Sequence, residues 1–196
     1  MKKMMFSLMT LFIALATQAQ TAKTWQVDPV HSAVKFSVSH LVISEVDGSF
    51  KKFQGSIKSA QADLQDAQIE FNIDVNSINT DNNMRDEHLK SADFFDAKQF
   101  PSMKFVSTSF KKKSGNNYIL TGNMTIKGVT KKVSYNVVYG GIAKDGYGNT
   151  KAGFKVKGII NRFDYDLKWN ALTEAGGATV GKDIDMTLNL EFAQDK

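Results

Sequence analysis

The chain has 196 residues, of which 42% are hydrophobic and 23% charged, and its formal net charge is +5. This length and composition fit one globular domain and exclude wholesale disorder. Cysteine is absent, which excludes disulfides, thiolate metal sites and a cysteine nucleophile. Phenylalanine, with 14 residues, and methionine, with 8, are both abundant for this length.

The first 19 residues are predicted to be a secretory signal peptide. Lys2 and Lys3 precede a 13-residue apolar stretch without charge, and the small side chains of Thr17 and Ala19 suit a cleavage site. The apolar stretch is shorter than the roughly 20 residues that span a bilayer. We therefore expect cleavage after Ala19, a location in the periplasm or outside the cell, and no membrane span after cleavage.

The domain that we expect to remain, residues 20–196, is less basic than the whole chain. Without the two signal-peptide lysines it has 23 basic and 20 acidic residues, a net charge of +3. The longest basic run, Lys111–Lys113, lies in a predicted turn, where a solvated loop is the simplest interpretation. We therefore expect no nucleic-acid partner. Four methionines but only two phenylalanines belong to the predicted signal peptide, so the aromatic excess belongs to the domain itself.

From residue 24 onward the sequence alternates between apolar and polar residues. Successive strand side chains point to opposite faces, so this alternation predicts antiparallel strands with one wet face. Turn sequences such as Asp47-Gly48, Lys127-Gly128, Gly140-Gly141 and 145–149 separate the runs. The pattern predicts an all-β sandwich or closed barrel. The expected strands are 24–28, 31–40, 48–58, 66–76, 103–111, 117–127, 130–140 and 150–161, with a ninth at 182–193.

One segment, near residues 81–91, predicts a short helix. Thr80 or Asp81 would cap it, and Asp86 and Lys90 would form a favourable pair four residues apart. Arg85, Asp86 and His88 make this the densest polar group in the chain. Two interpretations stay open: a polar lid over a ligand head group, or a helix attached to the rim of the sheet by hydrogen bonds.

The sequence motifs of enzymes and metal sites are missing. The three histidines are His31, His40 and His88, and the first two would lie on opposite faces of one regular strand. No H-E-x-x-H, G-x-S-x-G or phosphate-binding glycine loop occurs. We therefore predict no catalytic residue, no metal and no cofactor.

Five blocks of sequence, in order and spacing, resemble the YceI-like polyisoprenoid-binding proteins. The most specific block is Met84-Arg85-Asp86-Glu87-His88-Leu89, followed by Asp93-Phe94-Phe95-Asp96 and Phe100-Pro101. The resemblance covers about residues 25–192. The other blocks are Trp25–Leu41, Gly48–Gly55, Leu120–Lys131 and Asn161–Tyr165.

This resemblance implies an extended eight-stranded antiparallel β-barrel of lipocalin-like shape, with an apolar pore for an isoprenoid or similar long-chain lipid. It implies binding rather than catalysis, as a carrier, a buffer or a stress-related binding protein. We chose the ligand-binding residues from strand register and from the matched helix block. They are Phe36, Val38, His40, Phe71, Ile73, Arg85, His88, Phe105, Met124, Tyr135, Val137, Phe154, Met186 and Leu188.

Two other functions remain as alternatives. One is a lipid-modifying enzyme that uses His40 and His88. The other is a protein-interaction module that uses the Phe94-Phe95 loop. The sequence also leaves a homodimer open.

Overall fold

The computed structural model describes residues 21–171 and 179–195, so the predicted signal peptide lies outside the described residues. One α-helix, two short 3-10 helices and eleven strands make up this part of the chain. No helix within these two ranges is long and apolar enough to cross a bilayer. The strands are β1 Lys23–Val27, β2 Ala33–His40, β3 Ser44–Phe50, β4 Phe53–Ser59, β5 Gln68–Asp74, β6 Ile78–Asn79, β7 Ser102–Ser114, β8 Asn117–Ile126, β9 Val129–Lys144, β10 Thr150–Asn161 and β11 Val180–Gln194. The helices are η1 Val75–Ser77, α1 Asn83–Lys90 and η2 Arg162–Tyr165.

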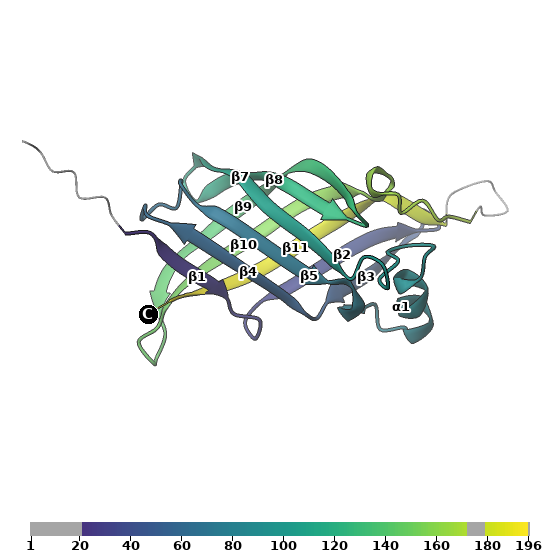
Figure 1. The fold of residues 1–196 in the computed structure, drawn as a ribbon, viewed down its shortest axis with the longest axis horizontal. Coiled ribbons are helices and arrows are strands. Elements are labelled where there is room, and N and C mark those ends of the chain that lie inside the picture. Colours follow the sequence, from purple (N-terminus) through teal and green to yellow (C-terminus); the bar gives the residue numbers. More distant parts are fainter. Residues whose placement is uncertain (1–20, 172–178, 196) are drawn as a thin grey trace, which may run out of the picture.

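Eight of the strands form a closed antiparallel barrel, as predicted. Neighbouring strands follow the order β1-β4-β5-β7-β8-β9-β10-β11, and β1 closes the ring against β11. The remaining strands, β2, β3 and β6, continue the sheet from β11 at one end of the barrel. Figure 1 shows α1 at this end and the C-terminus at the other. The barrel therefore has two different ends.

The region predicted as one strand at 48–58 contains two strands instead. Lys51 and Lys52 separate β3 from β4. Asp47-Gly48, predicted to be a turn, lies within β3, and Gly48 pairs with Phe36 of β2. A Cβ at Gly48 would lie 2.2 Å from Cζ of Phe36, so this glycine makes room for a ring and does not bend the chain. The actual turn lies at 41–43.

The predicted turn at Gly140-Gly141 is also wrong. Both glycines lie within β9, which runs to Lys144. The pairing of β9 with β10 shifts register between Gly153 and Phe154, and Gly141 has φ +96. The pair is therefore a β-bulge, which glycine tolerates because it has no Cβ. The predicted turns at Lys127-Gly128 and 145–149 are confirmed.

The predicted helix is present, but its cap and its ion pair differ from the prediction. Asn82 is the N-cap, and its side chain accepts a hydrogen bond from the backbone N–H of Arg85. Asp86 is buried and accepts hydrogen bonds from Thr80, so it does not pair with Lys90. Lys90 pairs with Glu87 instead, at 2.9 Å. Cap and charge-pair signals located the helix, but tertiary contacts determine its actual cap and ion pair.

Aromatic rings lie directly over glycines on neighbouring strands, three in the barrel and one on the β2–β3 extension of the sheet. A Cβ at any of these glycines would come within 2.4 Å of a ring atom. Such contacts fix the rings flat against the wall and leave space along the axis, since a ring seated on a glycine does not project into the interior. The four pairs are Phe36 over Gly48, Phe71 over Gly55, Phe105 over Gly122 and Tyr135 over Gly158.

We expect Gly158→Ala to destabilise the barrel. The new methyl group would lie 2.1 Å from Cδ1 of Tyr135, which must rotate toward the interior. Overpacking of this kind costs about 1–3 kcal/mol of unfolding free energy, measurable by urea denaturation. Gly153→Ala is the matched control, because a Cβ there meets nothing within 4 Å. Equal stability of the two variants would contradict this account of the glycines.

Candidate functional site

A large cavity lies inside the barrel at the end that carries α1. Its volume is about 630 Å³, within the range of ligand-binding pockets. Side chains from β2, β3, α1, η2 and β11 line it. The half-buried His40 and the exposed Met84 are among them, so the cavity reaches the surface between α1 and the β2–β3 turn. We call this opening the mouth.

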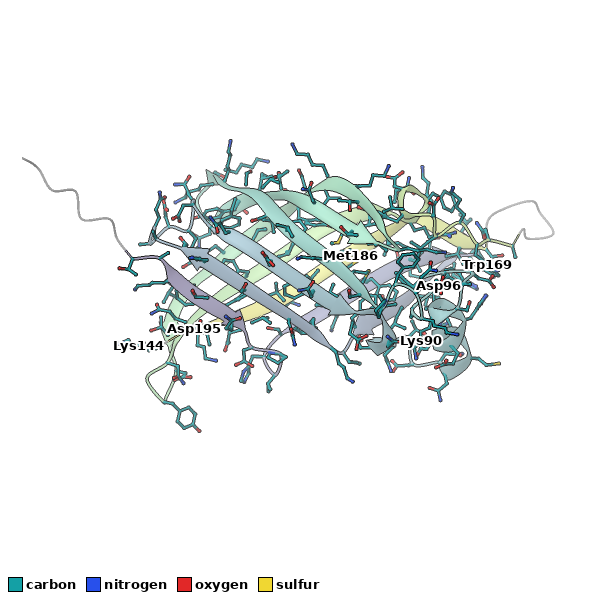
Figure 2. The ribbon with its side chains drawn as sticks, viewed as in Figure 1. Lys90, Asp96, Lys144, Trp169, Met186 and Asp195 are labelled. Atoms are coloured by element: carbon teal, nitrogen blue, oxygen red, sulfur yellow. The ribbon has the colours of Figure 1, made fainter. Side chains whose placement is uncertain are left out.

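A second, smaller cavity of about 70 Å³ lies deeper in the barrel. Ile73, Met103, Met124 and Met186 line both cavities, so these four side chains form the boundary between them. We call this boundary the methionine waist. Figure 2 places Met186 midway along the barrel, between Trp169 near α1 and Asp195 at the opposite end. Methionine is flexible and fills irregular gaps, so the waist adapts its width more easily than branched side chains would.

A row of aromatic rings closes the barrel beyond the small cavity. Phe110 stacks on Tyr118 at 4.6 Å, Tyr118 meets Tyr139 at 6.1 Å, and Tyr139 stacks on Phe154 at 5.2 Å. Phe154 then meets Phe192 edge-on at 5.7 Å. The interior is therefore a blind apolar pocket, open at α1 and sealed at the other end.

All fourteen residues chosen from the sequence line one of the two cavities. Eight of them line the large cavity: Phe36, Val38, His40, Ile73, Arg85, His88, Met124 and Met186. The other six line the small cavity: Phe71, Phe105, Tyr135, Val137, Phe154 and Leu188. Strand alternation is sufficient to find the twelve that lie on strands, because residues two apart share the interior face, whereas Arg85 and His88 come from the matched helix block. Which of them touch a ligand stays a prediction.

Several lining residues were missed. Met103 shares a strand face with Phe105 two residues later, so the same alternation would have found it. Phe94, Arg162, Tyr165 and Trp169 lie in loops or in η2, where no periodic signal indicates which side chains point inward.

Hydrogen bonds fix α1 at the mouth. The backbone N–H of Thr80 donates to Asp86 Oδ1 at 2.9 Å, and the Thr80 hydroxyl donates to the same oxygen at 2.6 Å. Arg85 donates from Nε to the Thr80 hydroxyl and from Nη2 to the Thr80 carbonyl oxygen, both at 2.7 Å. Arg85 thus combines both interpretations of the helix: it holds the helix on the barrel rim, and it lines the cavity.

An aromatic cluster forms another part of the rim. The ring of His88 lies edge-on to Phe94 at 5.1 Å and to Trp169 at 4.9 Å. The Nε2 atom of His88 is 3.0 Å from Asp93 Oδ2. Within residues 21–171 and 179–195, no hydroxyl group is hydrogen-bonded to this ring, so the nucleophile of a Ser-His-Asp arrangement is missing there.

The Phe94-Phe95 loop packs into the rim. Phe94 is buried and lies 5.1 Å from Trp169, while the half-buried Phe95 meets Phe50 edge-on at 6.2 Å. These rings form part of the cavity wall and are poorly placed to contact a protein partner.

Arg162 is a buried cation beside the mouth. Its guanidinium donates to the carbonyl oxygens of Leu167, Trp169, Val180 and Gly181 at 2.5 to 3.0 Å. Burial lowers the pKa of Arg162. These four hydrogen bonds hold the segment after η2 against the start of β11, and so they shape the rim.

Two buried tyrosine hydroxyls lie within the barrel. Tyr165 lines the large cavity and Tyr135 the small one. Neither hydroxyl has a hydrogen-bond partner among the described residues. Burial raises the pKa of Tyr165 to about 12 and that of Tyr135 further, so both phenols are neutral at physiological pH. The interior therefore carries no tyrosinate charge.

A separate polar cluster lies away from the cavities, where β1 meets β11. His31 Nδ1 is 3.0 Å from Asp28 Oδ2 and 3.8 Å from Glu191 Oε1. Asp28, His31 and Glu191 together offer three atoms that could ligate a metal. The ammonium of Lys151, however, lies 2.8 Å from Asp28 and 3.2 Å from Glu191. A cation of the protein already occupies this position. The exposed His31, predicted to lie in the strand at 31–40, lies outside it, since β2 begins at Ala33.

Comparison with known proteins assigns the chain to one family. The family described as YceI-like domain matches residues 25–192. A UPF0312 protein of Staphylococcus aureus (strain MSSA476) is 35% identical over 167 residues, which cover 85% of this chain and 95% of that protein.

Solved structures share the same fold. BcnA of Burkholderia cenocepacia has a TM-score of 0.72 and 26% identity, over 84% of this chain and 98% of that one. The YCEI protein of Campylobacter jejuni has a TM-score of 0.68 and 34% identity, over 81% and 90%. A polyisoprenoid binding domain from Saccharophagus degradans, implicated in plant cell wall breakdown, has a TM-score of 0.66 over 87% and 98%; at 14% identity this likeness shows the fold alone.

The polar cluster gives a prediction about His31. The hydrogen bond that His31 donates to Asp28 and the charges of Asp28 and Glu191 raise the pKa of His31 above its usual 6.5. Folding thus favours the imidazolium, and the resulting stabilisation is complete below about pH 6.5 and is lost as the pH rises through the folded-state pKa. NMR titration of the imidazole should give a pKa above 6.5, and Asp28→Asn should lower it. The same pKa in both proteins would show that the pair does not form.

Proposed function

The chain belongs to the YceI-like domain family, and from its cavity we propose that it binds a polyisoprenoid or a similar long-chain amphiphilic lipid inside the barrel. We further propose that it acts in the periplasm or outside the cell, as a carrier, a buffer or a stress-related binding protein. The location rests on the predicted signal peptide.

The blind apolar pocket is the observation that carries this proposal. A mouth at α1 leads into the large cavity, the adaptable methionine waist separates it from the small cavity, and aromatic rings fill the end beyond. A long, slender apolar chain fits this shape, because it can enter at one end and extend along the axis. The fold of the Saccharophagus degradans polyisoprenoid binding domain, which this chain shares, supports the same class of ligand.

Polarity along the axis orients the ligand. Polar side chains gather at the mouth, where Thr80, Asn82, Arg85 and His88 line the large cavity. The small cavity is lined almost entirely by aliphatic and aromatic side chains. We infer that the apolar tail enters first and that the polar end of the lipid stays beside α1.

The energetics suit reversible binding. Enclosing apolar surface contributes about 25 cal/mol per Å². Ordering a flexible chain and losing free translation and rotation oppose this gain by about 4–15 kcal/mol. Because both terms are large and opposed, a net affinity compatible with release is expected, as a carrier requires.

Binding, rather than catalysis, is the reading that the site and the family favour. The enzyme alternative would use His88 and Asp93, which lie 3.0 Å apart at the rim. His88→Ala decides between these readings. A lipid turnover that disappears in this variant while binding persists would support the enzyme.

The protein contains a suitable optical reporter for ligand binding. Trp169 lines the large cavity, whereas Trp25 is buried in β1 and lines neither cavity. Titration with farnesol should shift the tryptophan emission of the wild type and of Trp25→Phe, and should leave Trp169→Phe unchanged. Organic extraction of purified protein, followed by mass spectrometry, should release a long-chain lipid. Protein that is lipid-free from several hosts and does not respond to prenols would overturn the proposal.

The methionine waist gives a prediction about ligand length. Replacing Met124 by Ala removes side-chain volume between the two cavities and opens the inner one. We expect the affinity for geranylgeraniol to rise relative to that for the shorter farnesol. Core truncation at this site also costs about 2–5 kcal/mol of stability, so thermal unfolding is measured in parallel.

The matched control for the waist is Met84→Ala. Met84 lies at the exposed mouth, outside the waist, and its truncation should leave the length preference unchanged. If Met124→Ala changed both affinities by the same factor, the waist would not select for chain length.

A further inference from the structure

The most exposed group of hydrophobic side chains in the described chain surrounds the mouth. Val42 is 76% exposed, Ile43 85% and Met84 83%, and Leu41 adjoins them at 38%. Residues 41–43 form the turn between β2 and β3, and we call them the apolar tip. Met84 lies in the first turn of α1. Large apolar side chains rarely face water in groups without a binding role.

Local structure does not explain the sequence of the apolar tip. The N–H of Ile43 donates to the carbonyl oxygen of His40 at 3.2 Å, which closes a tight turn with Leu41 and Val42 at its centre. Both central residues have positive φ, 53 and 64. Such a turn favours Asn-Gly, and a β-branched residue such as Val42 is strained there.

Three other hairpin tips of this protein follow the usual chemistry. Gly115 lies in the β7–β8 turn, Lys127-Gly128 joins β8 to β9, and Gly148 lies in the β9–β10 loop, all with positive φ. Leu64 in the β4–β5 connection also has positive φ, but its side chain is buried, whereas the tip at the mouth combines positive φ with three consecutive exposed apolar residues. Strained residues cluster at functional sites, where another requirement outweighs stability.

The apolar tip is continuous with the cavity. Val38 and His40 before the tip and Val46 after it line the large cavity, as does Met84. The N–H of Leu41 donates to the carbonyl oxygen of Thr179, another lining residue, at 2.9 Å. An apolar surface therefore runs from solvent, over the tip, into the interior.

We propose that the apolar tip, together with Met84, inserts into the interfacial region of a lipid bilayer. The mouth of the cavity then lies against the membrane surface. This inference rests on the proposed function, because a long-chain lipid resides in membranes and would otherwise have to cross water to reach the cavity. Partly inserted apolar side chains bind a membrane in proportion to the area that they bury there.

The size and chemistry of the surface favour a bilayer over a protein. A stable protein interface buries about 1,000 Å² or more with good shape complementarity. One hairpin tip and one methionine are small for that purpose, whereas a fluid bilayer needs no complementary shape. The tip itself, Leu41-Val42-Ile43, carries no charge, so we expect insertion without a requirement for anionic lipid.

Vesicle flotation with a matched pair of variants tests this proposal. The wild type should float with phosphatidylcholine vesicles, and comparably when phosphatidylglycerol is added. The variant Leu41→Asn/Val42→Gly supplies the sequence that the turn prefers and removes most of the apolar tip. We expect it to lose vesicle binding by about tenfold or more, while its melting temperature is equal to or above that of the wild type.

The control variant carries its change at the other end of the barrel. Tyr147, which is 93% exposed in the β9–β10 loop, is replaced by Ser and should leave flotation unchanged (Figure 1). Farnesol binding in solution, followed by Trp169 emission, should be unaffected in the tip variant. If the wild type bound farnesol but did not float with vesicles, the membrane proposal alone would be overturned. If the wild type did not bind farnesol, the proposed function would be overturned instead.

Other outcomes also decide the matter. Flotation that requires phosphatidylglycerol and disappears in high salt would show electrostatic adsorption and contradict insertion of the tip. Self-association that depends on the tip, observed by ultracentrifugation without vesicle binding, would assign the surface to a second copy of the chain and overturn the proposal.

Discussion

The pairing of β1 with β11 is the constraint on which the rest of the structure depends. Only three residue pairs make this closure, from Trp25 opposite Gln194 to Val27 opposite Phe192. Without it the sheet would keep two open edges and the interior would be exposed to water. The neighbouring cluster of Asp28, His31, Lys151 and Glu191 strengthens the same junction with charge-assisted hydrogen bonds. Closure of the ring is what turns alternating strands into an enclosed apolar space.

An enclosed barrel of eight strands is narrow enough for side chains to fill it completely. Here the aromatic residues lie flat, because glycines on the neighbouring strands leave room for their rings. Phe105 over Gly122 and Tyr135 over Gly158 show the arrangement. The wall is therefore apolar, while the axis stays open at one end. Seating these rings on glycines thus lets aromatic side chains line the barrel without filling the cavity.

The barrel and the cavity wall could be predicted from the sequence because both depend on a period of two. Phe71 and Ile73, for example, had to share a face once the strand was recognised. The turns were harder, since Gly48 and Gly141 look like turn residues but serve a ring contact and a bulge. The rim residues Arg162, in η2, and Trp169, in a loop, lack a periodic signal, and their side-chain directions depend on tertiary contacts. Half of the methionines belong to the predicted signal peptide, yet three of the four methionines after it belong to the waist.

The two ends of the barrel differ in a way that bears on how a ligand would move. At one end, stacked rings from Phe110 to Phe192 seal the interior with well-packed contacts. At the other end, the turn at Leu41 and Val42 keeps an unfavourable backbone conformation with apolar side chains in water. A sequence selected for stability alone would have placed a pair such as Asn-Gly at this turn. The β8–β9 turn, which also has positive φ at both central residues, does contain a glycine, in Lys127-Gly128. Because the strain and the exposed apolar surface coincide with the mouth, the lipid exchange that we propose at that end would explain both.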